Sequence, residues 1–377
     1  MPIAVSGRIL AIGAFLLASD GGAQIDLGDP AKAESPAACS QVDHEKQGAI
    51  AWRAPGLNTI AEPPNPNGPT IVGVGFFVSD IRGIDPVRDE FQFRGHVRSV
   101  WCDPRLAFDP AIADHEELVF TGKQVEAELR HMWFASGYPA NKTAEPNISE
   151  RVLRIRHDGT VEQSINISLP LATTYDLHRF PFDRQILALQ VESYLWHRDQ
   201  LRLVHDETIS GFNDGINIPE WTIRAVHGHV TDVAVMRSDA RFSRYTLEIE
   251  IDRKPGFYLW KVFLPLIVIV SLPWSVFWMA DERFSARSRI SATGVLTIVA
   301  YQFVFAESLP RVGYLTLLDQ VMIGSFGLLA VTVLESLFVD RANREDPANS
   351  IRIDEISRWL FPTVYALMLA AIAMLAG

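Results

Sequence analysis

The sequence predicts two parts in one chain, an all-β sandwich followed by a bundle of four membrane-spanning helices. Hydrophobic residues make up 48% of the 377 residues, but they are concentrated in long runs in the last third of the chain. The middle third alternates apolar and polar residues in short segments separated by turn residues. Because a β-strand places successive side chains on opposite faces, this alternation indicates half-buried strands rather than helices.

The β part runs over residues 69–254. Residues 70–78 and the segment around Phe91 and Phe93 are rich in β-forming residues, and residues 151–156 lead through His157-Asp-Gly159 into a further segment of this kind. A short turn between two alternating segments is typical of a β-hairpin. Many short antiparallel strands without helical segments predict an immunoglobulin-like sandwich.

The membrane part covers residues 255–377 and holds four apolar segments, at 257–279, 284–308, 314–339 and 356–375. Each is long enough to cross a bilayer as a helix, which takes about 20 residues. Arginines gather at the ends that an outside start for the chain would place in the cytoplasm. They are Arg283, Arg287, Arg289, Arg341, Arg344 and Arg352.

The first 68 residues have a different character. Residues 1–23 have the features of a secretory signal peptide, with Arg8 before an apolar core and small residues at 21–23. The alternative is a first membrane span, but the core is shorter than the roughly 20 residues that a span needs. Residues 24–68 are rich in Pro, Gly, Ala and Asn and are interpreted as an N-terminal extension or linker.

Composition excludes several kinds of protein. The net charge of −11 argues against nucleic-acid binding. We find no nucleophile elbow and no glycine-rich phosphate loop, so an enzyme is not expected, and neither is a cofactor. His227 and His229 share a strand face, but two histidines alone do not make a metal site, and none is predicted. Cys39 and Cys102 either form one disulfide or remain two unpaired thiols.

The second apolar segment carries a regular stripe of residues at spacings of four, three, four, three and four. It consists of Arg289, Thr293, Leu296, Ala300, Phe303 and Glu307. This spacing places them on one face of a helix with a period of about 3.5 residues. A charge in hydrocarbon is costly, so the stripe must face protein or water. In a ring of subunits it would line a channel whose apolar middle forms the constriction; the alternative is a buried seam between helices of one subunit.

Two motifs resemble those of one receptor family. Trp101-Cys-Asp-Pro-Arg-Leu106 resembles the W-x-D-x-R-L motif of the Cys-loop receptor superfamily, and residues 176–185, with Phe-Pro-Phe-Asp at their centre, resemble its signature loop. The cysteines that close this loop in eukaryotic members would fall at Thr173 and Leu187 and are absent, as in bacterial members. The chain is therefore identified as a member of the bacterial pentameric ligand-gated ion channels.

This resemblance implies a homopentamer, in which each chain meets identical subunits, and a small-molecule or proton agonist bound between subunits. It also implies contact with permeant inorganic ions and membrane lipid, in a bacterial inner membrane with the ligand-binding domain in the periplasm. The agonist would lie in a box of aromatic residues, for which the matching positions are Trp133, Glu192, Tyr194, Trp196 and Phe242. The alternative is that these aromatic side chains belong to the core.

Arg237 and Arg241 depart from a similar bacterial member that is gated by primary amines, so an anionic ligand or protons remain open as agonists. Asp183 and Arg253 match an ion pair that couples the two domains in the family. Further residues implied at this junction are Asp85, Phe180, Pro181, Phe182, Pro310 and Tyr314.

The ion selectivity has opposing signals. Ala286 stands where cation-conducting relatives have Glu, and Ser285-Ala286-Arg287 is similar to the Pro-Ala-Arg of anion-conducting relatives. A ring of Arg289 side chains would also favour anions, although Asp281, Glu282 and Glu307 place acid near both mouths. We expect an anion preference. The alternative function is a non-conducting, membrane-anchored periplasmic sensor.

Overall fold

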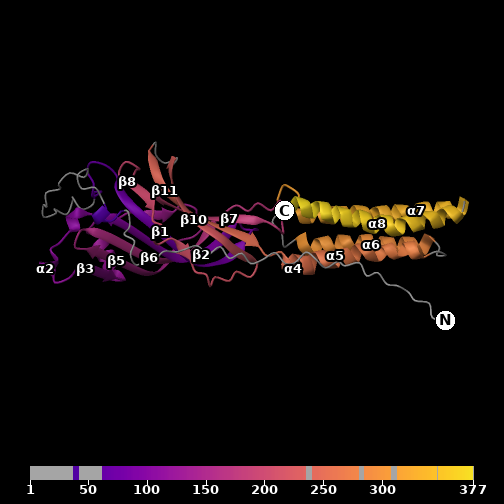
Figure 1. Ribbon diagram of the computed structural model, residues 1–377, viewed down its shortest axis with the longest axis horizontal. Helices are drawn as coiled ribbons and strands as arrows, with labels where there is room; N and C mark the ends of the chain where they lie inside the picture. Colours follow the sequence, from indigo (N-terminus) through magenta and orange to yellow (C-terminus); the bar gives the residue numbers. More distant parts are fainter. Residues whose placement is uncertain are drawn as a thin grey trace, which may run out of the picture. The chain divides into compact units, whose positions relative to one another are not determined.

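The computed structural model describes residues 37–41, 62–234, 240–279, 284–306, 312–345 and 347–376. Within these residues the chain forms strands first and long helices afterwards, in the order that the sequence predicts (Figure 1). The predicted signal peptide at 1–23 and most of the expected extension at 24–68 lie outside the described residues.

The larger of two sheets has seven strands, and its central strands come from the β1–β2 and β5–β6 hairpins. Its order is β3 (Glu117–Thr121), β5 (Asn147–Arg156), β6 (Thr160–Ala172), β2 (Glu90–Cys102), β1 (Thr70–Asp85) and β8 (Leu201–His205), with β9 (Gly211–Phe212) also paired to β1. Strands β8 and β9 run parallel to β1, and the other pairs are antiparallel.

The smaller sheet has four antiparallel strands. They are β10 (Trp221–Ala234), β11 (Arg241–Arg253), β7 (Arg184–Ser193) and β4 (Gly137–Pro139), in this order across the sheet. Four short helical segments connect the strands or precede them: η1 (Cys39–Gln41), η2 (Pro104–Leu106), α2 (Pro110–Ala113) and α3 (Lys123–Leu129).

The core lies between the two sheets. Val72, Val74, Phe76 and Val78 alternate along β1 and are all buried. The ring of Phe76 stacks on that of Tyr245 from β11, with 5.2 Å between ring centroids. Burial of such apolar side chains contributes about 25 cal/mol per Å² and holds the sheets together. The predicted β-sandwich followed by helices is confirmed.

The predicted hairpin at residues 157–159 joins β5 to β6. Gly159 adopts a φ of 88°, a backbone conformation that residues with a Cβ rarely adopt. A Cβ at this position would also lie 2.6 Å from the carbonyl oxygen of Asp103. Glycine is therefore required here by both the turn and its close approach to the segment after β2.

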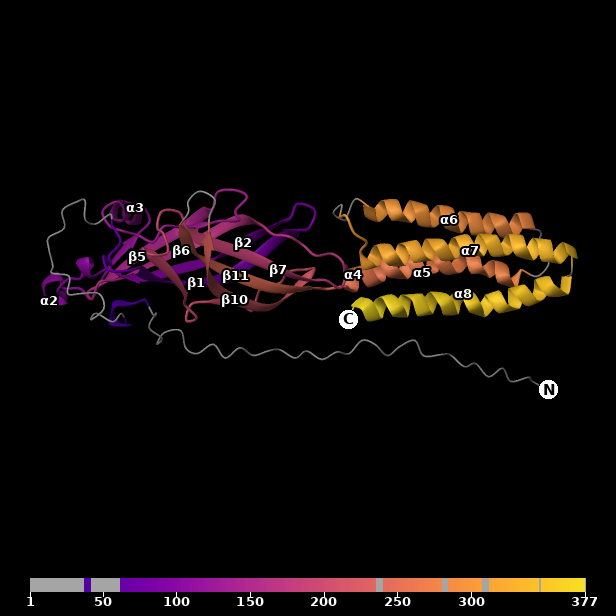
Figure 2. The same ribbon diagram turned by 90° about the horizontal axis from the view of Figure 1, so that it is seen from above.

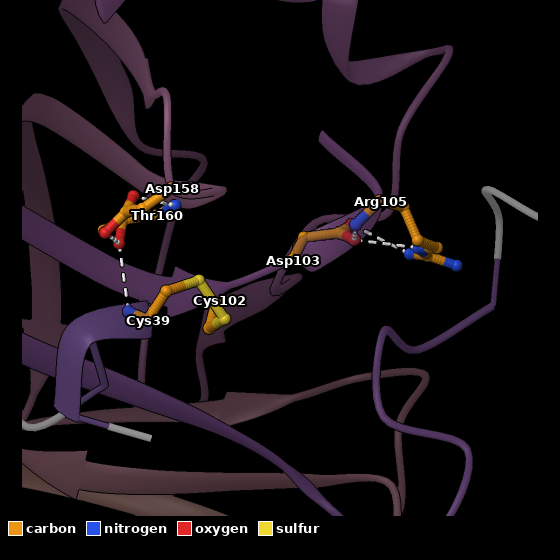
Figure 3. Close-up of a disulfide and its surroundings, with 6 residues drawn as sticks. All are labelled: Cys39, Cys102, Asp103, Arg105, Asp158 and Thr160. Carbon is orange, nitrogen blue, oxygen red and sulfur yellow. Dashed lines mark hydrogen bonds and ion pairs between the residues drawn. A yellow bond between two sulfur atoms is a disulfide. The ribbon is translucent and has the colours of Figure 1, made fainter. Parts of the chain in front are cut away.

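Cys39 and Cys102 form a disulfide that decides between the two alternatives for these residues (Figure 3). The Cys39 backbone N–H also donates to Oγ1 of Thr160 at 3.0 Å, and Asp158 in turn accepts from Thr160. The bond ties η1 to the end of β2 across 63 residues of sequence. Closing a loop of this length restricts the unfolded chain and is worth about 4 kcal/mol on the loop-entropy estimate.

The helices begin directly after β11. The first is built from four segments, α4 (Gly256–Tyr258), the π-helical η3 (Leu259–Phe263), α5 (Leu264–Ser271) and the 3-10 helix η4 (Leu272–Trp278). Pro265 and Pro273 stand near the starts of α5 and η4, and each removes a backbone donor, which accounts for the changes of helix type.

Three further helices follow, α6 (Phe284–Ala306), α7 (Leu317–Glu345) and α8 (Pro347–Ala376), and they run side by side with α5 in both ribbon views (Figures 1 and 2). In the described part of the chain, 256–278, 317–344 and 348–374 are long and apolar enough to cross a membrane. Three bounds differ from the expected spans by more than two residues, one of them being the end of α7 at Glu345 instead of 339. Helix α7 begins after Tyr314, and α8 begins nine residues before 356 because the polar segment 347–355 is also helical.

Candidate functional site

The expected agonist site lies where β7 ends beside the edge strand β4. The ring of Tyr194 is 59% exposed and packs edge-on against Tyr138, with 5.6 Å between ring centroids. Tyr138 pairs with Glu192 in the β4–β7 register, so the strand pairing itself brings these side chains together. Trp196 is partly buried one turn further along, where its backbone N–H donates to Ser193. An aromatic surface of this kind suits a small organic ligand.

Glu192 is a buried carboxylate with two strong partners. Arg244 of β11 donates to Oε2 from Nη2 at 3.0 Å and from Nε at 3.2 Å, and the Tyr138 hydroxyl donates to Oε1 at 2.6 Å. Charge-assisted bonds of this type are stronger than those between neutral groups. The arginine therefore balances the negative charge beneath the aromatic surface within the subunit.

Trp133 and Phe242 are buried, whereas residues that contact an agonist are expected to be accessible. Trp133 is buried in the sandwich core, edge-on against Trp101 at 5.8 Å and tilted against Trp196 at 6.1 Å. Phe242 is buried beside the ring of His197 at 5.1 Å. Both match the alternative interpretation, in which large aromatic residues fill the interior because that buries the most apolar surface.

Asp183 and Arg253 form the expected ion pair at the end of the sandwich next to the first helix. Arg253 donates from Nε to Oδ1 at 2.7 Å and from Nη2 to Oδ2 at 3.1 Å. Both side chains are buried, and Gln185 donates a further bond to Asp183 at 2.6 Å. The guanidinium also lies over the rings of Trp221, at 4.1 Å, and Phe180, at 4.9 Å. The predicted pairing is confirmed.

The signature loop contacts the segment that leads into α7. The Leu177 backbone N–H donates to the Tyr314 hydroxyl at 2.9 Å, and the Leu317 N–H donates to the His178 carbonyl at 3.1 Å. The His178 ring stacks on Tyr314 with 3.7 Å between centroids. Asp176 accepts from the His178 backbone N–H, and this bond holds the pKa of Asp176 below its usual value.

The other residues expected at this junction differ in their burial and in their contacts. Phe180 is buried against the helices and Pro181 is buried beside it, joined by a cis peptide bond. Phe182, two residues after Phe180, is 37% exposed. Asp85 instead accepts from the backbone N–H groups of Val87 and Arg88 in its own turn. Pro310 lies outside the described residues.

The comparison with known families agrees with this geometry. A profile of the neurotransmitter-gated ion-channel ligand binding domain matches residues 53–255, which is more than half of the chain. The chain belongs to this family. It is 26% identical over 299 residues to the gamma-aminobutyric acid receptor subunit beta-4 of Gallus gallus, a match that spans 76% of this chain and 59% of that relative. The chain thus covers less than two thirds of the relative's length.

Family membership and the three apolar helices together make this a membrane protein with an extracellular ligand-binding domain. The stripe on the second span lies on the exposed side of α6 in this family member. Leu296 and Phe303 are 70% and 72% exposed, and Arg289, Thr293 and Ala300 are also exposed. The opposite side of α6 is buried, at Arg287, Ser291, Gly294 and Ile298. Glu307, the last residue of the stripe, lies outside the described residues.

Sequence reasoning missed a buried charge cluster among the helices of this family member. Arg287 donates to both oxygens of Asp354, at 2.6 and 2.9 Å, and approaches Glu335 at 3.5 Å. All three side chains are buried. The available signal was Glu335 within the third apolar segment, since a charge inside a membrane helix needs a partner, whereas Asp354 lies just before the fourth segment.

Proposed function

We propose that this chain is one subunit of a homopentameric ligand-gated ion channel whose pore is lined by α6. The observation that carries the proposal is the exposed stripe on α6, which is polar at its start and apolar further along, at residues where a lipid-facing helix would be uniformly apolar. Five copies of this stripe around an axis would face a shared aqueous space. The outer faces of α7 and α8, which expose Leu334, Phe338, Trp359 and Leu367, suit contact with lipid.

The closed pore would be narrowest at the apolar part of the stripe. Leu296 and Phe303 project from the exposed face two helical turns apart, so a pentamer would have two rings of apolar side chains. A narrow apolar ring expels water and blocks ions without any physical plug. In this proposal Leu296 is the main gate.

We further propose that the pore prefers anions. Arg289 is exposed at the start of the stripe, whereas Arg287 is turned into the bundle and neutralised by Asp354. Only one of these two arginines would therefore contribute charge to the pore, and it would do so once per subunit. A ring of guanidinium groups remains charged at any workable pH and repels cations at short range.

The agonist would bind at the exposed aromatic surface formed by Tyr194 and Tyr138, with Trp196 beside it. Glu192, the acid beneath this surface, already pairs with Arg244 and Tyr138. An ammonium ligand would have to compete with that arginine for the carboxylate, which favours an agonist other than a primary amine. Small anionic ligands and protons are the agonist classes that fit this charge arrangement.

Binding would reach the pore through strand β7, the Asp183–Arg253 pair and the contact of the signature loop with Tyr314. These contacts form one connected path from Tyr194 to α7. A ligand opens the channel only if it binds the open state more tightly than the closed state. We propose a bacterial inner membrane as the location, with the sandwich in the periplasm. A non-conducting sensor would have no use for the α6 stripe.

Two experiments test this proposal. Native mass spectrometry in mild detergent should find a pentamer, and a stable dimer or tetramer as the main species would contradict it. Planar bilayers containing the purified protein, screened with pH steps and small charged ligands, should reveal an agonist. Tyr194→Ala should then lower the agonist's potency and leave the conductance unchanged, whereas the neighbouring exposed Leu195→Ala should leave both unchanged. Retained potency in Tyr194→Ala would move the agonist site elsewhere.

A further inference from the structure

The sandwich contains a cavity of about 570 Å³ between its two sheets. Strands β1, β2, β6 and β8 form one wall, and β7 with the segment from Phe134 to Pro139 forms the other. Most of the lining is apolar, including Val72, Val74, Phe76, Ile165, Leu201 and Leu203. Sites for small organic ligands have volumes of about 300–1,000 Å³ and walls of this composition.

Polar side chains stand at core-facing positions around this cavity. Odd-numbered residues of β6 point into the sandwich, and Gln163 takes such a position between the buried Val161 and Leu169. Gln163 is 7% exposed, and its side chain lines the cavity. Ser99 lies opposite Gln163 in the β2–β6 register and lines the same cavity. A sandwich core would ordinarily have apolar residues at these positions.

Two further polar atoms in the lining are buried and have no protein partner among the described residues. They are Oγ of Ser136, just before β4, and Nε of Arg151 on β5. An unsatisfied buried polar group costs about 1–3 kcal/mol. Two such groups beside one apolar cavity point to a ligand that provides the missing hydrogen bonds.

The charges around the cavity indicate the kind of ligand. Arg130 and Arg151 line it together with one acid, Glu126, and no ion pair joins this acid to either arginine within the described residues. An arginine binds a carboxylate through two parallel hydrogen bonds. An amine would meet the same positive charges, and an apolar molecule would leave the polar atoms unpaired.

We propose that this cavity is a second small-molecule site, which binds an organic acid. The apolar body of the acid lies between the sheets, and its carboxylate accepts hydrogen bonds from Arg151, with Gln163 and Ser136 in reach of its polar atoms. The site is formed within one subunit. It is separate from the aromatic surface at Tyr194, and its occupancy can be measured whether or not the protein conducts ions.

The two sites share a wall. Val191 and Ser193 line the cavity, whereas Glu192 between them bonds to Tyr138 and Arg244 at the aromatic surface. Gly137 and Pro139 likewise line the cavity on either side of Tyr138. An acid in the cavity would press on the same strands that carry the aromatic surface, so it would act as a modulator of agonist binding.

Isothermal titration of the full-length protein in detergent tests the ligand class. The probes are 3-phenylpropionate, its neutral amide 3-phenylpropionamide and the cation 3-phenylpropylamine. The acid should bind at least about tenfold more tightly than either analogue. Arg151→Gln should remove this preference, whereas Arg154→Gln, an exposed arginine on the same strand, should retain it. Equal affinity for acid and amide, or unchanged binding in Arg151→Gln, would overturn the proposal.

A labelling experiment keeps the test decisive if Arg151→Gln fails to fold. No free cysteine lies in the described residues, and the sequence has only the two bonded ones, so Ser136→Cys introduces a single reactive thiol. A methanethiosulfonate reagent should label this thiol more slowly when 3-phenylpropionate is present. Ser149→Cys, at an exposed position on β5, should be labelled at the same rate with and without the acid. Equal rates at Ser136→Cys with and without the acid would show that it binds elsewhere.

Discussion

Arg253 binds both carboxylate oxygens of Asp183 in a buried pair that closes the end of the sandwich next to the first helix. One residue away on each strand, Arg184 and Asp252 form a second pair at 2.7 Å, but both of these side chains are exposed. The two pairs have the same chemistry and nearly the same place in the β7–β11 register. They differ chiefly in burial, and this makes the exposed pair a matched control for the buried one.

Breaking the buried pair should be costly. Asp183→Ala leaves the buried Arg253 guanidinium, between Trp221 and Phe180, with the exposed Glu220 at 3.7 Å as its acid partner. Loss of one partner of a buried pair costs about 3–5 kcal/mol. A double-mutant cycle on the free energy of unfolding should give a coupling of about 1–3 kcal/mol for Asp183 and Arg253. The same cycle for Arg184 and Asp252 should give less than about 1 kcal/mol. Equal coupling in both cycles would contradict the structural role assigned to the buried pair.

The sandwich was predictable because apolar residues recur at every second position of its strands. Val72, Val74, Phe76 and Val78 on β1 show this pattern. The hairpin between β5 and β6 was predictable from Gly159, because its turn needs a positive φ that favours glycine. The Asp183–Arg253 pair was predictable from motif positions. The exposed stripe on α6 followed from spacing alone, since residues three and four apart share a helix face.

Other features depend on contacts between distant segments, which spacing does not encode. Nothing in the sequence placed Cys39 beside Cys102 or Arg287 beside Asp354. Trp133 is an aromatic residue of the kind found in ligand sites, but it is buried, because Trp101 and Trp196 from other segments pack against it. Phe180 and Phe182 belong to the same motif, but Phe180 is buried and Phe182 is exposed, a difference that the motif alone does not reveal.

His205 should make the stability of the sandwich depend on pH. Its Nδ1 lies 3.0 Å from the hydroxyl of Tyr245, and burial lowers the pKa of His205, against the opposing effect of Glu207 and Asp206. Burial also raises the pKa of Tyr245 to about 12, so this hydroxyl stays protonated and can donate to the neutral imidazole. The unfolded chain therefore binds the proton more tightly, and stability is lost as the pH falls below the ordinary histidine value.

This dependence can be measured by thermal unfolding at about pH 5.5 and pH 7.5, on either side of the unperturbed histidine pKa. The wild-type protein should have the lower melting temperature at the acidic pH, and His205→Gln should reduce the difference between the two values. His115→Gln, at an exposed position, should leave the difference unchanged. An unaltered difference in His205→Gln would contradict the assignment.

Arg289 should set the selectivity of the pore. Reversal potentials under a salt gradient should lie toward the anion limit in the wild-type channel, because a ring of guanidinium groups repels cations at close range. Arg289→Gln should shift the reversal potential toward cations. Arg352→Gln, an exposed arginine on α8 outside the proposed pore, should cause no shift. A wild-type value near the cation limit would contradict the anion preference.

The most direct test of the pore assignment is the spontaneous current of Leu296→Ser in planar bilayers. A hydroxyl at this position wets the apolar ring, so the variant should conduct without agonist or leak more than the wild-type protein. Leu334→Ser, at an exposed position on the proposed lipid-facing side of α7, serves as the control and should not leak. The account predicts a raised resting current in Leu296→Ser alone. An unchanged resting current in a pentameric Leu296→Ser protein, or an equal rise in both variants, would contradict it.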